Sequence, residues 1–395
     1  ATTPSHDYRL QIVATVAISG DELQPVYLKP QQSIAALKEE LLAVGAAGEA
    51  SGGTLAFRLL KGPVLLKDSE SLKSVGLVDD PTVQVVRSLH PPVVTASCDK
   101  TAKVWLTDTG DCVKSFEPHG NEVRCARFNP GGTVLATASN NGSCSKGQLK
   151  FWDVATGKCL SSTWVHTDML RSVAFAHDGR QLVTASDDCT ATIWESSTMR
   201  PLRKLEGHSR EVWSAEFSAC SRFVVTGSAD RTSKVWNVDN GECVATFNAQ
   251  SQVRAAVISK STERAATAGA DGAVKVWSIP TPTAARTLSG HTNEVWAVAF
   301  SEDERWIVSA GVDTRVLVWE VEFGVVVRTL TGHFGPVVSV SFCQTDNLFV
   351  TASTDGTARV WNLEAGSCLQ TLCGQHTRPL WSAQFLPPAV ELSPL

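Results

Sequence analysis

The stretch at residues 207–236, GHSREVWSAEFSACSRFVVTGSADRTSKVW, contains the pattern that most of the chain repeats. It begins with Gly-His and continues through an apolar run, a turn and a second apolar run ending in Ser-x-Asp. A third run then ends in Trp. The steps between successive equivalent tryptophans are 47, 42, 42, 41, 42 and 42 residues. These seven tryptophans are Trp105, Trp152, Trp194, Trp236, Trp277, Trp319 and Trp361.

A period of this length, with three or four short strand-like runs per unit, is typical of a propeller blade. The sequence therefore predicts a mainly β protein whose residues 91–395 form a seven-bladed β-propeller. The first unit starts in its second strand, at VVTASCDKTAKVW (residues 93–105). Residues 380–385 form an apolar run without a partner of their own, so we expect them to be the innermost strand of the first blade. Such closure of the ring removes open sheet edges.

Composition limits the classes of function. The 35 Lys and Arg residues against 40 Asp and Glu are spread along the chain, which argues against direct nucleic-acid binding. No run reaches the ~18 apolar residues of a membrane span. The first residues, ATTPSHDYRL, lack a charged and then apolar signal peptide. We expect a cytoplasmic protein without membrane insertion, with a nuclear, cytoskeletal or ciliary assembly as alternatives.

The 11 cysteines show neither a C-x-x-C pair nor Cys/His ligand spacing, so we expect no metal site. Four of them occupy one repeated place shortly after the blade Trp, which predicts small buried thiols in a reducing compartment. These four are Cys112, Cys159, Cys243 and Cys368.

Residues 1–90 have a different pattern. Strand-like alternation at residues 10–18 and 25–28 precedes an amphipathic helix predicted at residues 34–44, and further strands follow at 55–60, 64–66 and 82–86. With LLKGPVLLKDSESLKSVGL and TVQVVR, this order resembles the ubiquitin-like fold. The resemblance implies a small α+β (β-grasp) domain over residues 1–90. The chain continues as RSLHP without a free diglycine, which argues against conjugation and favours a docking or stabilising domain.

Aligning the seven units shows a polar set in fixed register. A Ser or Thr lies four residues before a turn Asp, and a His precedes most units; the fifth unit lacks the His, and Asn141 replaces Asp in the second. These features resemble the WD-repeat family of β-propellers over about three quarters of the chain. The resemblance implies a buried hydrogen-bonded network in each blade. Two such sets are His208, Thr226, Asp230 and Trp236, and His376, Thr95, Asp99 and Trp105.

A recurring Ser/Thr, His and Asp also suggests a hydrolase. Catalysis, however, requires one activated nucleophile in a cleft, whereas this set recurs around the ring together with a Trp. There is no Gly-x-Ser-x-Gly motif, and residues 142–147 (GSCSKG) lack the Lys-Ser/Thr of a phosphate-binding loop. The sequence predicts no enzyme activity and no cofactor.

The resemblance implies that the loops before the first strand and between the second and third strands form one binding face. The residues expected to point there are Trp381, Arg124, Arg171, Trp213, Arg254, Trp296 and Val338, with Cys98, Asp187, Ala229, Val312 and Thr354 beside them. Trp and Arg are typical of interface hot spots. Glu122, Glu211 and Glu294 could pair with the arginines. We expect protein partners that present extended peptides or loops; alternatively, the tryptophans only cover the channel mouth.

The leading hypothesis is a non-catalytic protein-interaction scaffold within a larger assembly. One alternative is an adaptor in the ubiquitin system, although no Trp-Asp-x-Arg signature of cullin-linked receptors is present. Another is a ribosome-assembly factor resembling the Notchless type, in which a ubiquitin-like domain also precedes a WD-repeat propeller. In that type an acidic side chain of the small domain is functional, and the segment before the blades contains the pair Asp79-Asp80.

Overall fold

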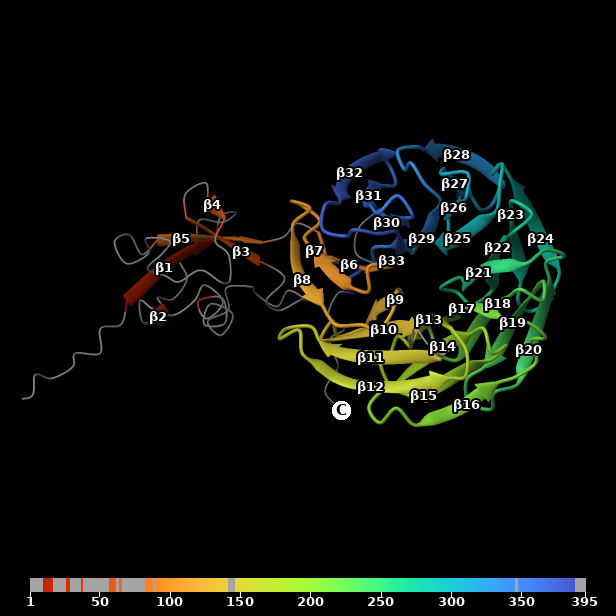
Figure 1. Ribbon diagram of the computed structural model, residues 1–395. Helices are drawn as coiled ribbons and strands as arrows, with labels where there is room; N and C mark the ends of the chain where they lie inside the picture. The colour runs from red at the N-terminus through yellow and green to blue at the C-terminus, as the bar shows by residue number, and fades with distance from the viewer. Residues whose placement is uncertain are drawn as a thin grey trace, which may run out of the picture. The chain divides into compact units, whose positions relative to one another are not determined.

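The chain divides into two compact units, Ala1–Pro91 and Pro92–Leu395. The computed structural model describes residues 10–16, 26–28, 37, 57–61, 64–65, 82–87, 90–140, 146–344 and 347–387. Each unit is considered by itself (Figure 1).

In the described part of the first unit, five strands form one sheet in the order β2-β1-β5-β3-β4. β1 runs parallel to β5, and the other neighbours are antiparallel. Of the predicted helix at residues 34–44, only Leu37 lies within the described residues, and it is buried. The strands are β1 (Leu10–Val16), β2 (Val26–Leu28), β3 (Phe57–Lys61), β4 (Val64–Leu65) and β5 (Thr82–Arg87).

The second unit confirms the predicted seven-bladed propeller. Seven four-stranded antiparallel sheets surround a central channel, and each sheet runs from an innermost to an outermost strand (Figure 1). In this inner-to-outer order the strands are, for blade 1, β33 (Leu380–Phe385), β6 (Val93–Ser97), β7 (Ala102–Trp105) and β8 (Cys112–Phe116); for blade 2, β9 (Val123–Phe128), β10 (Val134–Asn140), β11 (Gly147–Asp153) and β12 (Cys159–His166); for blade 3, β13 (Leu170–Phe175), β14 (Gln181–Ser186), β15 (Ala191–Glu195) and β16 (Pro201–Leu205); for blade 4, β17 (Val212–Phe217), β18 (Phe223–Ser228), β19 (Thr232–Asn237) and β20 (Cys243–Asn248); for blade 5, β21 (Val253–Ile258), β22 (Arg264–Gly269), β23 (Ala273–Ser278) and β24 (Ala284–Ser289); for blade 6, β25 (Val295–Phe300), β26 (Trp306–Gly311), β27 (Val316–Glu320) and β28 (Val325–Leu330); and for blade 7, β29 (Val337–Phe342), β30 (Leu348–Ser353), β31 (Ala358–Asn362) and β32 (Ser367–Leu372).

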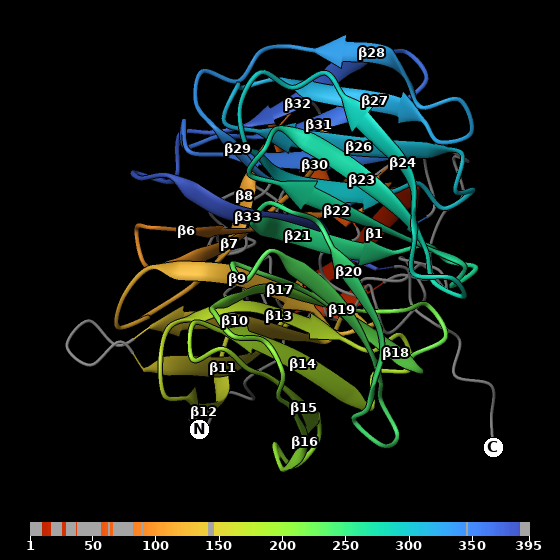
Figure 2. The same ribbon diagram turned by 90° about the vertical axis from the view of Figure 1, so that its right-hand side faces the viewer.

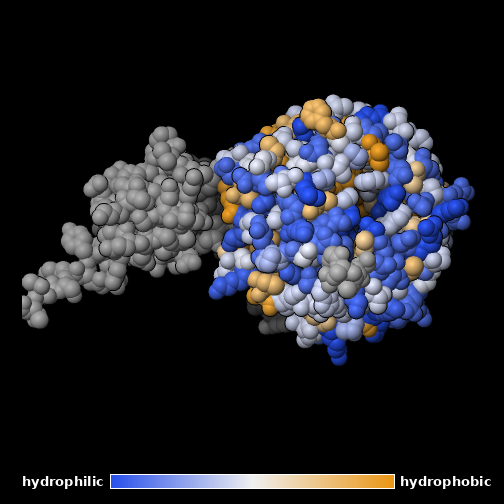
Figure 3. Space-filling view, in the orientation of Figure 1, coloured by the Kyte–Doolittle hydropathy of each residue, from blue (hydrophilic) through white to orange (hydrophobic). Residues whose placement is uncertain are grey.

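The hydrophobic core lies between neighbouring blades. The second strand of each blade is buried on both faces, as in β6 and β30, and therefore reads as a continuous run of apolar and small residues. Outermost strands such as β20 alternate between exposed and buried residues. On the propeller face visible in Figure 3, hydrophobic residues lie singly or in small groups among hydrophilic ones.

The last described strand closes the ring, as predicted. β33 pairs antiparallel with β6, with Leu380 opposite Ser97 and Phe385 opposite Val93 (Figure 2). Leu380 and Phe385 are buried in a cluster that joins blades 7 and 1. The first blade is therefore assembled from segments more than 280 residues apart in the chain.

The predicted burial of the four repeated cysteines is wrong. Cys159 and Cys243 are exposed, and Cys112 and Cys368 are partly exposed. Each is the first or second residue of an outermost strand and pairs with the blade Trp at a register shift, where only one neighbouring strand covers it. In every case the thiol donates to the carbonyl oxygen two residues further on. The repeated position reflects this local bulge and not core packing.

Closure predicts a large difference between two Ala→Asp substitutions. Ala383 on β33 is fully buried, so Ala383→Asp should lower the free energy of unfolding by about 4 kcal/mol, the cost of holding a buried carboxyl neutral at pH 7. The same substitution at exposed Ala284 on β24 should change it by less than about 0.5 kcal/mol. Urea unfolding of both variants measures this; equal losses would contradict closure by β33.

Candidate functional site

A chain of hydrogen bonds runs through blade 4 from its core to its loops. Trp236 Nε1–H donates to Thr226 Oγ1 at 2.9 Å, and this oxygen lies 2.7 Å from His208 Nε2. His208 Nδ1 lies 2.8 Å from Asp230 Oδ2. The other Asp230 oxygen accepts from the backbone N–H and the hydroxyl of Thr232. The chain therefore links the third strand, the loop before the first strand and the turn between the second and third strands.

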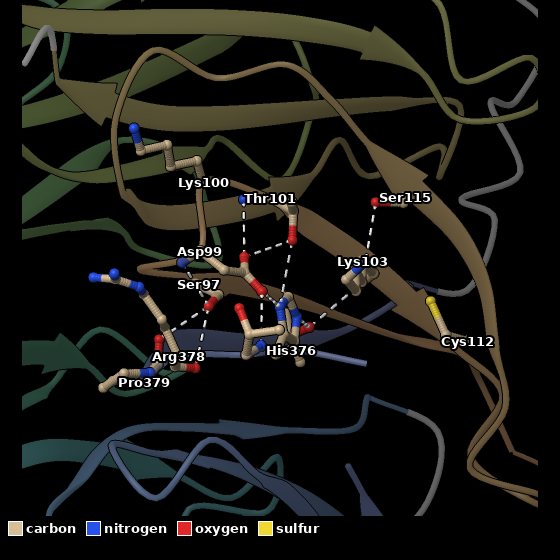
Figure 4. Close-up of polar contacts among 12 residues, drawn as sticks. Ser97, Asp99, Lys100, Thr101, Lys103, Cys112, Ser115, His376, Arg378 and Pro379 are labelled. Atoms are coloured by element: carbon tan, nitrogen blue, oxygen red, sulfur yellow. Dashed lines mark hydrogen bonds and ion pairs between the residues drawn. The ribbon is translucent and has the colours of Figure 1, made fainter. Parts of the chain in front are cut away.

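In blade 1 the same contacts join the two ends of the propeller (Figure 4). Trp105 Nε1 donates to Thr95 Oγ1 at 2.8 Å, and Thr95 Oγ1 lies 2.8 Å from His376 Nε2. His376 Nδ1 lies 2.7 Å from Asp99 Oδ2, while Thr101 donates to Asp99 Oδ1. Closure is thus made by side chains as well as by strand pairing. The network recurs in blades 3, 6 and 7 through His166, Thr184, Asp188 and Trp194; His291, Ser309, Asp313 and Trp319; and His333, Thr351, Asp355 and Trp361.

Two blades depart from this arrangement where the sequence does. In blade 2, His119 Nδ1 lies 3.1 Å from the Lys100 carbonyl oxygen of blade 1. Asn141, which takes the place of the turn Asp, lies outside the described residues. Blade 5 lacks the His, and the Lys275 ammonium instead donates to Asp271 and to the Ala249 carbonyl oxygen.

The protonation of the network follows from its burial. Burial lowers the pKa of His208, although Asp230 opposes this, so we assign a neutral ring whose Nδ1–H donates to Asp230. Burial alone would raise the pKa of Asp230, but hydrogen bonds from Thr232 and His208 outweigh it and hold the pKa below its ordinary value. Thr226 is fully buried and its oxygen already accepts from Trp236, so no substrate can approach it. This geometry holds loops in place and does not activate a nucleophile.

The predicted partner-binding residues come together at the mouth of the central channel. Arg124, Arg171, Trp213, Arg254, Trp296, Val338 and Trp381 all line a cavity of about 680 Å³ formed by the innermost strands. The guanidinium carbon of Arg124 lies 4.0 Å from the ring centroid of Trp381. That of Arg254 lies 4.1 Å from Trp213 and 5.6 Å from Trp296. The mouth is therefore built from cation–π stacks between neighbouring blades.

Each mouth arginine also has a carboxylate partner. Arg124 pairs with Glu122, and Arg254 Nη2 lies 2.9 Å from Glu294. Arg171 makes a two-pronged contact with Asp187, with distances of 2.8 and 2.5 Å.

Glu211, which was a third candidate partner for the mouth arginines, pairs instead with Arg210 at 3.5 Å. The charges of the three arginines are thus balanced by carboxylates within the protein. The arginines therefore shape the mouth but add little net charge to it.

Cys98 belongs to the same mouth. Trp381 Nε1 donates to its sulfur at 2.8 Å, and the Cys98 thiol donates to Glu122 Oε2 at 3.1 Å. Burial, followed by the contact with Glu122, raises the Cys98 pKa to about 11. The thiol is therefore neutral at physiological pH and orients Trp381 without being nucleophilic.

Sequence reasoning missed two residues of this region. Phe334, in the loop before β29, is 91% exposed, while the equivalent positions hold Gly, Ser or Thr in five of the other blades and Gln250 in blade 5. Glu216 lines the channel. Desolvation by the protein around it raises the pKa of the Glu216 carboxyl to about 7. The alignment of the units contains the signal for Phe334. The strand pattern of β17 alone does not reveal that position 216 lies in a narrow channel.

Among the described residues, no group of three or more His, Cys, Asp or Glu could hold a metal ion. In the same part of the chain, no helix is long and apolar enough to cross a bilayer.

Comparison with known proteins identifies two families. The family described as the IFT122 first beta-propeller matches residues 142–392, and the family described as WD domain, G-beta repeat matches residues 110–153. A relative, Nuclear distribution protein PAC1 of Komagataella phaffii (strain GS115 / ATCC 20864), is 37% identical over 83 residues. This segment is 20% of the present chain and 17% of that protein.

The network predicts unequal effects for one substitution in two blades. Thr226→Val leaves both Trp236 Nε1–H and His208 Nε2 without a partner, which should cost about 2–5 kcal/mol of unfolding free energy. Thr267→Val in blade 5, which has no His, strands only the Trp277 N–H and should cost roughly half as much. Urea unfolding at pH 7 measures both. A smaller loss for Thr226→Val than for Thr267→Val would contradict the role given to the His.

The network also predicts destabilisation in acid. Burial and the Lys150 ammonium lower the pKa of His119 from 6.5 to about 4. Between these values the unfolded chain takes up a proton that the folded chain does not, so the unfolding free energy falls as pH falls, by up to about 1.4 kcal/mol per pH unit. Urea unfolding at pH 7, 6, 5 and 4.5 should show a shallower dependence for His119→Gln than for the wild type. Identical slopes would refute this assignment.

Proposed function

Since this chain belongs to the WD-repeat β-propeller family, with the IFT122 first beta-propeller model matching more than half of it, we propose that it is a non-catalytic protein-interaction scaffold. Propellers of this family generally bind other proteins and are generally non-catalytic. The scaffold works within a larger assembly and holds partners on its loop face. A cytoplasmic location, or a nuclear, cytoskeletal or ciliary assembly, fits this role.

The observation that carries the proposal is the channel mouth. Trp213, Trp296 and Trp381 are each only partly buried, and each is fixed by an arginine stack or by a hydrogen bond to a neighbouring side chain. Partly exposed tryptophans on a rigid frame suit a protein interface, because little side-chain entropy is lost when a partner binds. An extended peptide or loop is the partner that fits a ring-shaped mouth.

The first unit contributes a second binding element in this proposal. The order β2-β1-β5-β3-β4, with β1 parallel to β5, supports the ubiquitin-like interpretation of residues 1–90. An adaptor in the ubiquitin system and a ribosome-assembly factor of the Notchless type are the alternatives that share this domain combination. The PAC1 relative is named for nuclear distribution, and its short match leaves that role as one further candidate.

The mouth tryptophans should be required for partner recovery. In affinity purification of the intact protein followed by mass spectrometry, Trp213→Ala/Trp296→Ala should lose at least about 90% of co-purified partners, since truncation of each hot spot costs about 2 kcal/mol or more. The matched control Trp164→Ala removes an exposed tryptophan from the outermost strand β12 and should retain them. Full recovery with the double variant, at an unchanged melting temperature, would refute the proposed face.

The identity of the recovered proteins separates the alternatives. Ubiquitin-ligase subunits, pre-ribosomal proteins and cytoskeletal proteins each correspond to one of the classes above.

A further inference from the structure

Blade 7 presents an aromatic side chain that the described part of the protein does not cover. Phe334 is 91% exposed, yet its backbone N–H donates to Asp355 Oδ2 at 2.9 Å. Asp355 in turn contacts His333, so the network holds the loop in place. Five of the other six blades have Gly, Ser or Thr at this position, namely Gly120, Thr167, Ser209, Thr292 and Thr377, and blade 5 has Gln250. A Phe held rigidly in water is typical of an interface anchor.

The channel mouth has its smallest side chain in the same blade. Six of the seven equivalent mouth positions carry Trp or Arg, and the seventh is Val338. Val338 lies partly buried against the cluster between blades 7 and 1, and its ring neighbours are Trp296 and Trp381. Because Val338 is short and apolar, this part of the mouth could pack against an incoming aliphatic or aromatic group.

Two unpaired cations lie on the next blade. Lys100 and Arg378 are exposed and make no ion pair among the described residues, and both line a second cavity of about 380 Å³. Asp99 and Glu122 also line this cavity, but both are already hydrogen-bonded within the protein. Figure 4 shows both side chains extending away from the His376 network on the same side. Asp355, which accepts from the Phe334 N–H, is followed in the same turn by Gly356. A Cβ placed on Gly356 would lie 3.7 Å from the Arg378 carbonyl oxygen, so the turn that holds the Phe334 loop adjoins the loop that carries Arg378.

These free charges decide the chemistry of the partner. The mouth arginines Arg124, Arg171 and Arg254 already have carboxylate partners, so they cannot bind further carboxylates without breaking an ion pair. Lys100 and Arg378 have no such partner to lose. An incoming Asp or Glu would therefore be attracted to these two residues and would steer the partner to this side of the ring.

Resting on the proposed function, we infer that the blade 7–1 sector, defined by Phe334, Val338, Lys100 and Arg378, binds an extended protein segment in which an apolar side chain is flanked by Asp or Glu. The apolar side chain packs on Phe334 and Val338. The acidic residues on one side of it contact Lys100 and Arg378.

Peptide selection tests this inference on the intact protein. A random twelve-residue phage library is selected against the wild type, and the recovered peptides are synthesised with a fluorescent label for anisotropy titration. They should be acidic, with a Leu, Ile, Phe or Trp next to Asp or Glu, and should bind more weakly as salt increases. Phe334→Ala and Lys100→Glu/Arg378→Glu should each raise Kd at least tenfold, equivalent to about 1.4 kcal/mol.

Matched controls separate this sector from general surface effects. Phe323→Ala removes an aromatic residue that is 62% exposed outside the sector, near the outermost strand β28. Arg231→Glu reverses an exposed charge at the position in blade 4 equivalent to Lys100. Both should leave Kd within about twofold of the wild type, and thermal melting should show that every variant is folded.

The remaining outcomes are decisive. Neutral or basic peptides, no selected peptide, or binding unaffected by Phe334→Ala and by the charge reversals would overturn the inference. If Trp213→Ala/Trp296→Ala abolishes binding while the sector variants do not, the sector is wrong and the proposed function stands. If proteins also fail to co-purify with the wild type, the proposed function fails as well. Assembly of the wild type into dimers that mask Phe334, seen by sedimentation, would assign the sector to a second copy and overturn the inference.

Discussion

Each blade buries an indole N–H, and a buried donor without an acceptor destabilises a protein by more than most single contacts stabilise it. A Ser or Thr oxygen accepts the hydrogen bond from the indole N–H in all seven blades, including blade 5, where the acceptor is Thr267. In most blades the hydroxyl then contacts a His, and the His contacts an Asp. The loops of the proposed binding face are consequently positioned by the hydrogen bonds that begin at the buried indole N–H.

This dependence explains what the sequence can and cannot predict. The period of the tryptophans is enough to predict seven blades, and the unpaired run at residues 380–385 is enough to predict closure, because neither depends on the conformation of individual side chains. Burial of Cys159 and Cys243 could not be inferred from their repetition, since a repeated position can as well be a bulge at an edge strand. Glu211 similarly occupies the repeat position of Glu122 and Glu294, yet it pairs with its sequence neighbour Arg210, which repeat alignment does not show.

In the candidate site, too, the sequence predicts positions but not side-chain contacts. Repeat alignment was sufficient to bring the mouth residues onto one ring, yet it could not show that their charges are satisfied internally. Arg171 illustrates this, because its partner Asp187 comes from the second-to-third strand turn and not from the glutamate position used by Arg124 and Arg254. Lys100 and Arg378 in blade 1, by contrast, make no ion pair among the described residues.

The split origin of blade 1 has a consequence for biosynthesis. While the chain is being translated, β6 emerges early but its innermost neighbour β33 is made last, so the edge of β6 stays unpaired until nearly the whole propeller has left the ribosome. Blades 2 to 7 are each contiguous in sequence and face no such delay. A nascent propeller therefore displays an exposed strand edge for most of its synthesis, the kind of edge that promotes pairing with other chains.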